Sequence, residues 1–227
     1  MGQRAMTRKA KQKAVAMLVG AILLVAALLL LVHNRNQDIR AGDSSQRVLA
    51  RIRPLIIERQ SGELSSKPTE NREKRDLGPS EPLPEKLAAK SNPASDMPVI
   101  EIDGFAYIGY LSIQALDLEL PVLSACDLEG LNIGPCRQFG SISTYDMTIA
   151  GHNYSNHFGR LHLLQAGDRV LFTDVKGQTE SFVVCAKEVL AATAVEKVRN
   201  SGWDLTLYTC TYGGHHRLLV GCRADSK

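Results

Sequence analysis

Residues 204–210 read Asp-Leu-Thr-Leu-Tyr-Thr-Cys, and this stretch indicates both the fold and the chemistry of the chain. Leucine alternates with threonine around one tyrosine, which is the pattern of a half-buried β-strand. The strand ends in Cys210, and the next residues, 211–214 (Thr-Tyr-Gly-Gly), form a predicted turn. A thiol at the end of a rigid strand is well placed to face a substrate groove. Cys210 is therefore a candidate nucleophile.

Short strands separated by turns dominate the C-terminal part of the chain, which begins near Pro98. Apolar and alternating runs predict further strands over residues 105–113, 116–123, 147–150, 169–174, 181–190 and 216–223. Short helical turns are expected over residues 127–131, 159–164 and 193–200. Many short strands with little helix are typical of an all-β sandwich or barrel. We therefore expect one mainly β domain over residues 98–227.

The N-terminal part has the pattern of a membrane anchor. Residues 1–13 carry five basic residues and no acid, and residues 14–32 then run for 19 residues without a charge. A helix of that length spans about 28 Å, close to the thickness of the hydrocarbon core. A cleaved signal peptide is the alternative, but its apolar region is usually shorter and ends in small residues. The basic cluster before the span predicts a cytoplasmic N-terminus and an extracytoplasmic domain.

The segment between the span and the domain, residues 33–97, divides into a helix and a linker. Apolar residues at helical spacing predict a short amphipathic helix within residues 43–60, which Pro54 would kink or shorten. From residue 61 to residue 97 the composition changes to Ser, Pro, Glu, Lys and Asn. Such a segment buries too little apolar surface to offset its ordering entropy, so we expect a flexible linker.

The charge distribution excludes one large class of function. Residues 1–97 carry a net charge of +7, whereas residues 98–227 carry −4. A nucleic-acid-binding protein should concentrate its basic residues on the folded domain, and this chain does the opposite. We therefore expect no nucleic-acid partner.

The chain has five cysteines, at positions 126, 136, 185, 210 and 222. An odd number outside the cytosol indicates at least one free thiol. The others are either buried thiols or include one disulfide, for which Cys126 and Cys136 are the closest pair in sequence. Cys222 alternates with Leu218 and Val220, and Cys185 lies in an apolar run, so both are predicted to lie in the core.

A nucleophilic cysteine needs a base or cation for its thiolate and a donor for the oxyanion at the attacked carbonyl. Two residues near predicted strand ends fit these needs. His152 follows the short strand 147–150, and Arg217 opens the last strand, directly after the turn that follows Cys210. If the last two strands are neighbours, Arg217 enters the sheet at the end where Cys210 leaves it.

These residues and their spacing resemble the sortase family. The matching pieces are Thr206-Leu207-Tyr208-Thr209-Cys210, Arg217-Leu218-Leu219-Val220 and Gly151-His152, with further similarity at 109–113, 120–122 and 153–168. The resemblance covers residues from about 100 to 223. The N-terminal anchor and linker also match the family.

The resemblance implies a closed eight-stranded β-barrel and a membrane-anchored cysteine transpeptidase. Such an enzyme cleaves a Leu-Pro-x-Thr-Gly-like sorting signal near the C-terminus of a secreted protein through a thioacyl-enzyme. It then transfers the product to an amine, from a peptidoglycan precursor or a pilin lysine. Cys210 would be the nucleophile, His152 the general acid/base, and Arg217 the residue that stabilises the oxyanion or holds the substrate. The resemblance implies no metal or organic cofactor.

Two features of the sequence bear on the subclass. An Asp-Pro-aromatic lid, typical of pilus-building sortases, does not occur, and the segment between Cys185 and Asp204 has room only for a short helix. The chain therefore looks more like the class D sortases than like the pilus-building sortases or those with a long helix before the catalytic strand. Two other functions stay open: a cysteine peptidase that resolves the acyl-enzyme with water, and a non-enzymatic anchored domain that binds a peptide.

Other polar residues near the motifs have weaker assignments. Asn153, Thr209 and Tyr212 adjoin the catalytic candidates and are expected to shape the substrate groove. His157 and His162 are expected at a loop or groove rim, because histidines at intervals of five suit neither one helix face nor a strand and do not predict a zinc site. Arg223 lies on the same strand face as Arg217, six residues further on, and is expected to be a solvated charge.

Overall fold

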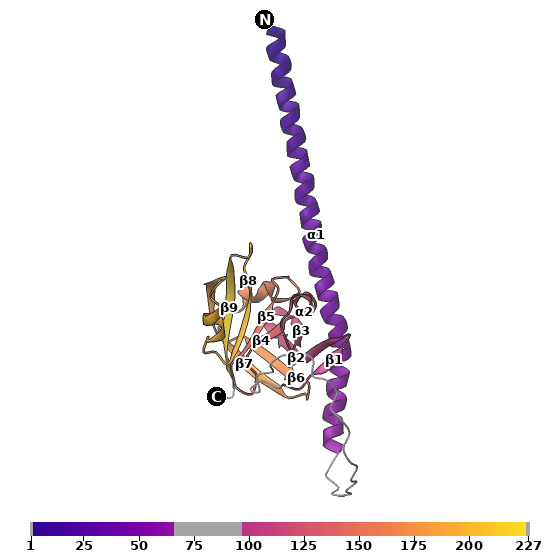
Figure 1. Cartoon of the computed structure of the whole chain (residues 1–227), viewed down its shortest axis with the longest axis vertical. Coiled ribbons are helices and arrows are strands. Elements are labelled where there is room, and N and C mark those ends of the chain that lie inside the picture. The colour runs from indigo at the N-terminus through magenta and orange to yellow at the C-terminus, as the bar shows by residue number, and fades with distance from the viewer. Residues whose placement is uncertain (1, 66–96, 226–227) are drawn as a thin grey trace, which may run out of the picture.

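The computed structural model describes residues 2–65 and 97–225, with side chains over residues 12–61 and 97–225, and consists of a long N-terminal helix packed against a β-barrel (Figure 1). Most of the predicted linker lies outside the described residues. The elements are α1 (Gly2–Ser65), β1 (Ile100–Ile102), β2 (Phe105–Ile113), η1 (Gln114–Leu116), β3 (Leu118–Leu123), α2 (Leu128–Ile133), β4 (Cys136–Phe139), β5 (Met147–Gly151), η2 (Phe158–Leu163), β6 (Arg169–Asp174), β7 (Thr179–Ala191), α3 (Val195–Arg199), β8 (Leu205–Cys210) and β9 (His216–Ala224).

The sheet closes on itself. Within the described residues its strands follow the order β1-β2-β3-β4-β5-β8-β9-β7-β6, and β6 also pairs with β2, so the eight strands from β2 to β9 form a closed barrel. The strand β1 pairs only with the first residues of β2, before β6 joins that strand. Two pairs are parallel, β3–β4 and β5–β8, so the barrel is mixed. The expected eight-stranded closed barrel is confirmed.

The barrel interior is filled by the inward-facing residues of the strands. Alternation along each strand places large apolar side chains inside. The fully buried ones on the strands include Ile108, Leu111, Ile113, Leu120, Met147, Ile149, Phe172 and Phe182, and Phe158 and Leu161 of η2 join them. Strand β8 contributes Leu205 and Leu207 to this cluster, and β9 contributes Val220 and Cys222. The predicted burial of Cys222 is confirmed, and burial raises the pKa of its thiol to about 12.

The helix predicted within residues 43–60 is not short and does not end at Pro54, because α1 runs without interruption from Gly2 to Ser65 with Pro54 inside it. Proline removes one helical hydrogen bond and costs about 3 kcal/mol in a helix interior. The helix is held on both sides of Pro54 by burial against the barrel, since Ile52 and Ile56 pack with Ile100, Ile102 and Tyr107. Tertiary packing therefore offsets the local cost.

The first part of α1 projects from the barrel (Figure 1). Its side chains from Val15 to Val32 contact no other element, and the large apolar ones are 49–77% exposed. Within the described residues it is the one helix whose length and apolar composition suffice to cross a membrane, with a mean hydropathy of 3.1 over its most apolar window. This part coincides with the predicted span.

The cysteines differ from expectation at one position. Cys185 is exposed, not buried. The pairing of β7 with β9 shifts by one residue between Val184 and Ala186, so Cys185 is the extra residue of a β-bulge and points outward. The open question about Cys126 and Cys136 is resolved, because the two form a disulfide with a Cα–Cα distance of 5.1 Å. This disulfide ties the segment before α2 to β4.

Candidate active site

Cys210 lies at the C-terminal end of β8, on the outer face of the barrel. Leu205, Leu207 and Thr209 point inward and are buried, whereas Tyr208 and Cys210 alternate with them and are half-buried. The alternation that predicted the strand therefore also decides the face on which the thiol emerges. Among the described thiols that lie outside the disulfide, Cys210 is neither buried like Cys222 nor placed on a bulge like Cys185.

Arg217 stands directly opposite Cys210 in the antiparallel pair β8–β9. Residues that face each other in such a pair project on the same side of the sheet, so the guanidinium and the thiol share the outer face. A tight turn over residues 211–216 holds the two strand ends together, with Thr211 N donating to His216 O at 3.0 Å. Arg217 Nη1 donates to the carbonyls of Gly214 and His216, at 3.0 and 3.2 Å.

His152 follows the C-terminal end of β5, which runs parallel to β8. The two strands are in register, with Gly151 beside Thr209, so one further residue brings His152 beside Cys210. Gly151 is required there because a Cβ would come within 2.7 Å of the Phe158 ring. Burial lowers the pKa of His152 below its ordinary value, which favours the neutral imidazole. Three neighbouring strands thus bring His152, Cys210 and Arg217 to one end of the barrel.

The loop after His152 is folded onto α1. His157 lies on a loop, as expected, but it is fully buried, and its Nε2 lies 3.0 Å from Ser45 Oγ of α1. The Tyr154 ring lies between the two histidines, 4.9 Å from the His152 ring and 5.7 Å from the His157 ring. Burial lowers the pKa of His157 to about 4. The sequence does not predict this burial, because nothing near residue 157 shows that α1 covers it.

His162 was expected at a loop or groove rim and lies on η2. It is exposed, and its Nδ1 lies 2.9 Å from Gly159 O. Within the described residues, no group of three or more His, Cys, Asp or Glu side chains lies close enough together to hold a metal ion.

A groove runs beside the outer face of β8. A pocket of about 170 Å³ is lined by Tyr208 and Arg217 together with Phe139 of β4 and Val198 of α3. A larger pocket of about 650 Å³ shares Gln138 and Phe139 with it and continues past the Cys126–Cys136 disulfide to the loop over residues 140–146. The two pockets therefore adjoin at Gln138 and Phe139, and the smaller one reaches Arg217.

Tyr208 has a shifted pKa, and Arg199 stacks on an aromatic ring. Burial raises the pKa of Tyr208 to about 12; the Arg217 charge lowers that pKa and the Cys210 sulfur raises it, both by smaller amounts. The guanidinium of Arg199 lies 4.2 Å above the Phe139 ring, at the boundary of the two pockets. The sequence did not reveal Phe139 as a lining residue, because β4 is only four residues long and was not predicted.

The remaining candidates are spread more widely. Thr209 points inward and is buried, with no hydrogen-bond partner for its Oγ1 among the described residues. Asn153 is half-buried directly after His152, and Tyr212 is 87% exposed on the β8–β9 turn. Of the three residues expected to shape the groove, Thr209 therefore faces the interior of the barrel.

Arg223 is exposed, as expected for a solvated charge, but it also has specific partners. It forms an ion pair of 3.0 Å with Asp204, and its guanidinium lies 4.7 Å above the Trp203 ring. Gly221 leaves the room that Trp203 occupies, since a Cβ there would overlap the indole. These contacts fix the start of β8 at the opposite end of the strand from Cys210.

Several solved structures are similar to this chain. A lid mutant of sortase A from Corynebacterium diphtheriae is 25% identical over 52% of this chain and 69% of its own, with a TM-score of 0.45. Sortase C1 from Streptococcus agalactiae is 26% identical over 55% and 70%, with a TM-score of 0.47. Sortase C from Clostridium perfringens with the C-terminal cell wall sorting motif is 21% identical over 52% and 70%, with a TM-score of 0.46. No curated protein matches the chain.

The family model described as the sortase domain matches residues 111–225, which include every strand from β3 to β9 and the three residues gathered at the end of the barrel. The match covers half of the whole chain and nearly all of the barrel. By this match, the chain belongs to the sortase family.

Proposed function

We propose that the protein is a membrane-anchored cysteine transpeptidase with Cys210 as its nucleophile. The observation that carries the proposal is the pairing of Cys210 with Arg217 across β8–β9, with His152 at the end of the parallel neighbour β5. A cysteine beside a cation and an imidazole is the arrangement that favours nucleophilic thiol chemistry.

The proposed reaction proceeds in two steps. The Cys210 sulfur attacks a peptide carbonyl while His152 takes the thiol proton, and the guanidinium of Arg217 donates to the oxyanion. The C–N bond then breaks, His152 returns the proton to the leaving amine, and a thioester remains on Cys210. An incoming amine attacks the thioester, loses a proton to His152 and releases the thiol. The lowered pKa of His152 suits this role, because the imidazole accepts a proton only when it is neutral.

The proposed substrate is the Leu-Pro-x-Thr-Gly-like sorting signal of a secreted protein. The smaller pocket is lined by Tyr208 and Arg217, and the larger one shares Gln138 and Phe139 with it, so an extended peptide laid over these two residues would occupy both pockets. The Thr carbonyl would lie at Cys210 and the residues before it along β4 and α3. The acceptor amine belongs to a peptidoglycan precursor or to a pilin lysine.

The proposed location is the cell membrane, with residues 14–32 of α1 as a single span, a cytoplasmic N-terminus and an extracytoplasmic barrel. The apolar side chains of this span are exposed and therefore need an apolar solvent. The basic residues before the span favour the cytoplasmic side.

Trapping the acyl-enzyme tests the proposal. The full chain in detergent, incubated with Leu-Pro-x-Thr-Gly peptides, should gain the mass of the acyl fragment on Cys210, and hydroxylamine should remove it. Adding an amine should release an amide product and restore the free thiol. Cys185→Ala is the matched control for a second exposed thiol and should form the same adduct.

Other outcomes identify the alternatives. If water hydrolyses the adduct and none of the amines tested forms an amide product, the protein is a peptidase. Binding of the peptide without an adduct, unchanged in Cys210→Ala, would indicate a non-enzymatic binding domain. Absence of both binding and adduct across a library of sorting motifs would contradict the proposed substrate class.

A further inference from the structure

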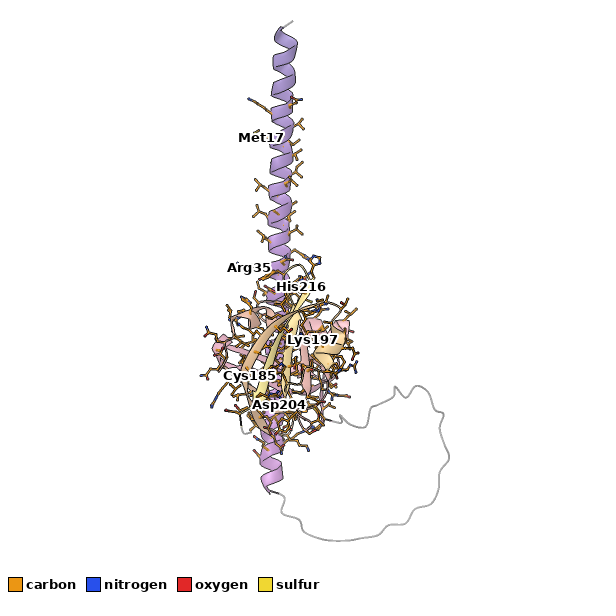
Figure 2. The ribbon with its side chains drawn as sticks, turned by 90° about the vertical axis from the view of Figure 1, so that its left-hand side faces the viewer. Met17, Arg35, Cys185, Lys197, Asp204 and His216 are labelled. Carbon is orange, nitrogen blue, oxygen red and sulfur yellow. A yellow bond between two sulfur atoms is a disulfide. The ribbon has the colours of Figure 1, made fainter. Side chains whose placement is uncertain are left out.

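The active-site end of the barrel points along α1 toward the apolar span. Figure 2 shows His216, the first residue of β9, at the end of the barrel nearer to Arg35, whereas Asp204, which precedes β8, lies at the opposite end. In Figure 1 the β8–β9 turn rises beside the helix in the same direction. Cys210 and Arg217 flank this turn.

Contacts along α1 give the height of each end of the barrel above the span. The Tyr154 ring, which contacts the His152 ring, donates its hydroxyl to Gln37 Oε1 at 3.3 Å. Gln37 lies five residues beyond Val32, so it is only about 8 Å further along the helix axis. At the other end of the barrel, Gln60 Nε2 donates to Gly177 O at 2.7 Å. Gln60 is 28 residues beyond Val32, about 42 Å along the axis.

The helix cannot turn or slide freely on the barrel. Asp38 accepts hydrogen bonds from Ser155 N at 3.3 Å and from Ser155 Oγ at 2.9 Å, and its backbone carbonyl accepts one from Asn156 at 3.1 Å. The Ser45–His157 hydrogen bond and the buried Ile52 fix the helix further along. Because α1 has no break between the span and these contacts, it holds the barrel at one height and in one orientation.

The residues at the span-facing end suit a lipid headgroup layer. Tyr212 is 87% exposed on the turn, and His215 and His216 beside it are exposed. Arg35 and Arg40 are exposed on the adjacent length of α1. Tyrosine is enriched at the membrane–water interface, and basic side chains attract the phosphates of anionic lipids. An exposed aromatic ring on the turn, with basic side chains on the adjoining length of α1, is therefore matched to this layer.

We infer that the β8–β9 turn rests on the headgroups of the membrane that α1 spans, so that Cys210 acts on scissile bonds held close to the bilayer surface. The partner of this surface is the phospholipid headgroup layer, and neither a protein nor a second copy of the chain is required. The inference rests on the proposed membrane anchor. It also assigns to the continuous α1 the task of setting the height of the active site.

Depth-dependent fluorescence quenching tests the contact without requiring catalysis. The full chain, one copy per nanodisc, would carry Tyr212→Trp or, at the far end of the barrel, Gln178→Trp; the parent chain, with Trp203 alone, gives the background. With spin labels on the lipid headgroups, the tryptophan at position 212 should be quenched at least threefold more strongly than the one at position 178. Equal quenching at both positions would overturn the inference. It would also be overturned if position 212 were strongly quenched in nanodiscs with two copies of the chain but not in nanodiscs with one copy.

Lengthening the helix tests the height of the active site above the membrane independently of its catalytic chemistry. Seven helical residues inserted between Arg35 and Asn36 lengthen the helix by about 10 Å and by nearly two full turns. The barrel therefore keeps its rotational orientation about the helix axis. The quenching at position 212 should fall to the level at position 178. Turnover of a sorting peptide carried on its own membrane span should fall at least tenfold, while turnover of the soluble peptide should stay within twofold.

The two readouts keep the inference distinct from the proposed function. If no peptide is turned over by any form of the chain, the proposed chemistry fails, and the quenching still decides whether the turn rests on the membrane. If quenching at position 212 is unchanged by the insertion, the helix does not set the height and the inference is wrong. Nanodiscs with and without anionic lipid show whether the arginines or the tyrosine provide the contact.

Discussion

Ser45 and His157, which are 112 residues apart in sequence, share a buried hydrogen bond of 3.0 Å between Oγ and Nε2. Ser45 Oγ also donates to the carbonyl of Ile133 at 2.7 Å. A hydroxyl has one proton, so His157 must donate from Nε2 and its ring carries its proton there. One serine thus joins α1, the end of α2 and the loop that follows His152.

Replacing Ser45 with alanine should destabilise the protein. The change leaves the His157 Nε2–H and the Ile133 carbonyl buried without their partner, which costs about 1–3 kcal/mol. Denaturant unfolding of the full chain in detergent measures the loss. Ser61→Ala is the control, because Ser61 is exposed and its hydroxyl donates to the carbonyl of Ile57 in the same helix. Equal stability of the two variants would show that the Ser45 bridge contributes nothing.

Stability should fall as the pH falls from about 6.5 to about 4 because of His157. Burial is the main cause of its low pKa; the Ala41 carbonyl and the Asp38 charge raise that pKa, and His152 lowers it. The unfolded chain takes up the proton near pH 6.5 and the folded chain only near pH 4, so protonation favours unfolding across this interval. The total loss is about 3 kcal/mol.

The measurement is the free energy of unfolding against pH for the parent chain and for His157→Gln. Glutamine does not titrate, so the variant should be less stable near pH 7 but should lose less stability between pH 6.5 and pH 4. The same slope in both chains would show that His157 is protonated in the fold or that other groups dominate.

Arg217→Lys should lower kcat about 10²-fold while the protein remains folded. Loss of a positioned oxyanion donor typically costs that much, and lysine lacks the planar fork of the guanidinium. Arg223→Lys is the matched control, since Arg223 lies on the same strand and pairs with Asp204. The control should cost about 1 kcal/mol of stability and leave turnover within twofold. Comparable turnover loss in both variants would exclude a special role for Arg217.

The thiols that lie outside the disulfide should differ in their reactivity with alkylating agents and in how their replacement changes turnover and stability. Iodoacetamide should label Cys185 and Cys210 in the folded chain but not Cys222, which is buried. Cys210→Ala should abolish turnover and leave stability nearly unchanged. Cys222→Ala should cost about 1–2 kcal/mol and retain turnover. Peptide mapping after labelling and denaturant unfolding check these outcomes, and rapid labelling of Cys222 would contradict its place in the core.

Reduction of the Cys126–Cys136 disulfide should destabilise the barrel. The bond closes a loop with a sequence separation of 10 residues, and for such a loop the chain-entropy model gives about 3 kcal/mol. Cys126→Ser with Cys136→Ser, compared with the oxidised parent by denaturant unfolding, measures this loss. A parent chain that unfolds at the same denaturant concentration with and without reductant would contradict the prediction.

The sequence alone predicted the strands whose side chains alternate. It placed β2 and β6 at the observed bounds and β5, β8 and β9 within a residue or two, because a period of two is local information. Once β8 and β9 are adjacent, a short turn brings Arg217 opposite Cys210. Strands β1 and β4 were missed, since three and four residues are too few to establish a period.

The sequence by itself therefore determined an apolar span followed by a β domain, with Cys210, Arg217 and His152 at strand ends. Only the tertiary structure decided that β5 lies parallel to β8, which brings His152 beside the thiol. It also decided that α1 continues past Pro54 and covers His157, and that a bulge turns Cys185 outward. These features depend on contacts between residues far apart in the chain, and their energies outweigh the local preferences that a sequence pattern records.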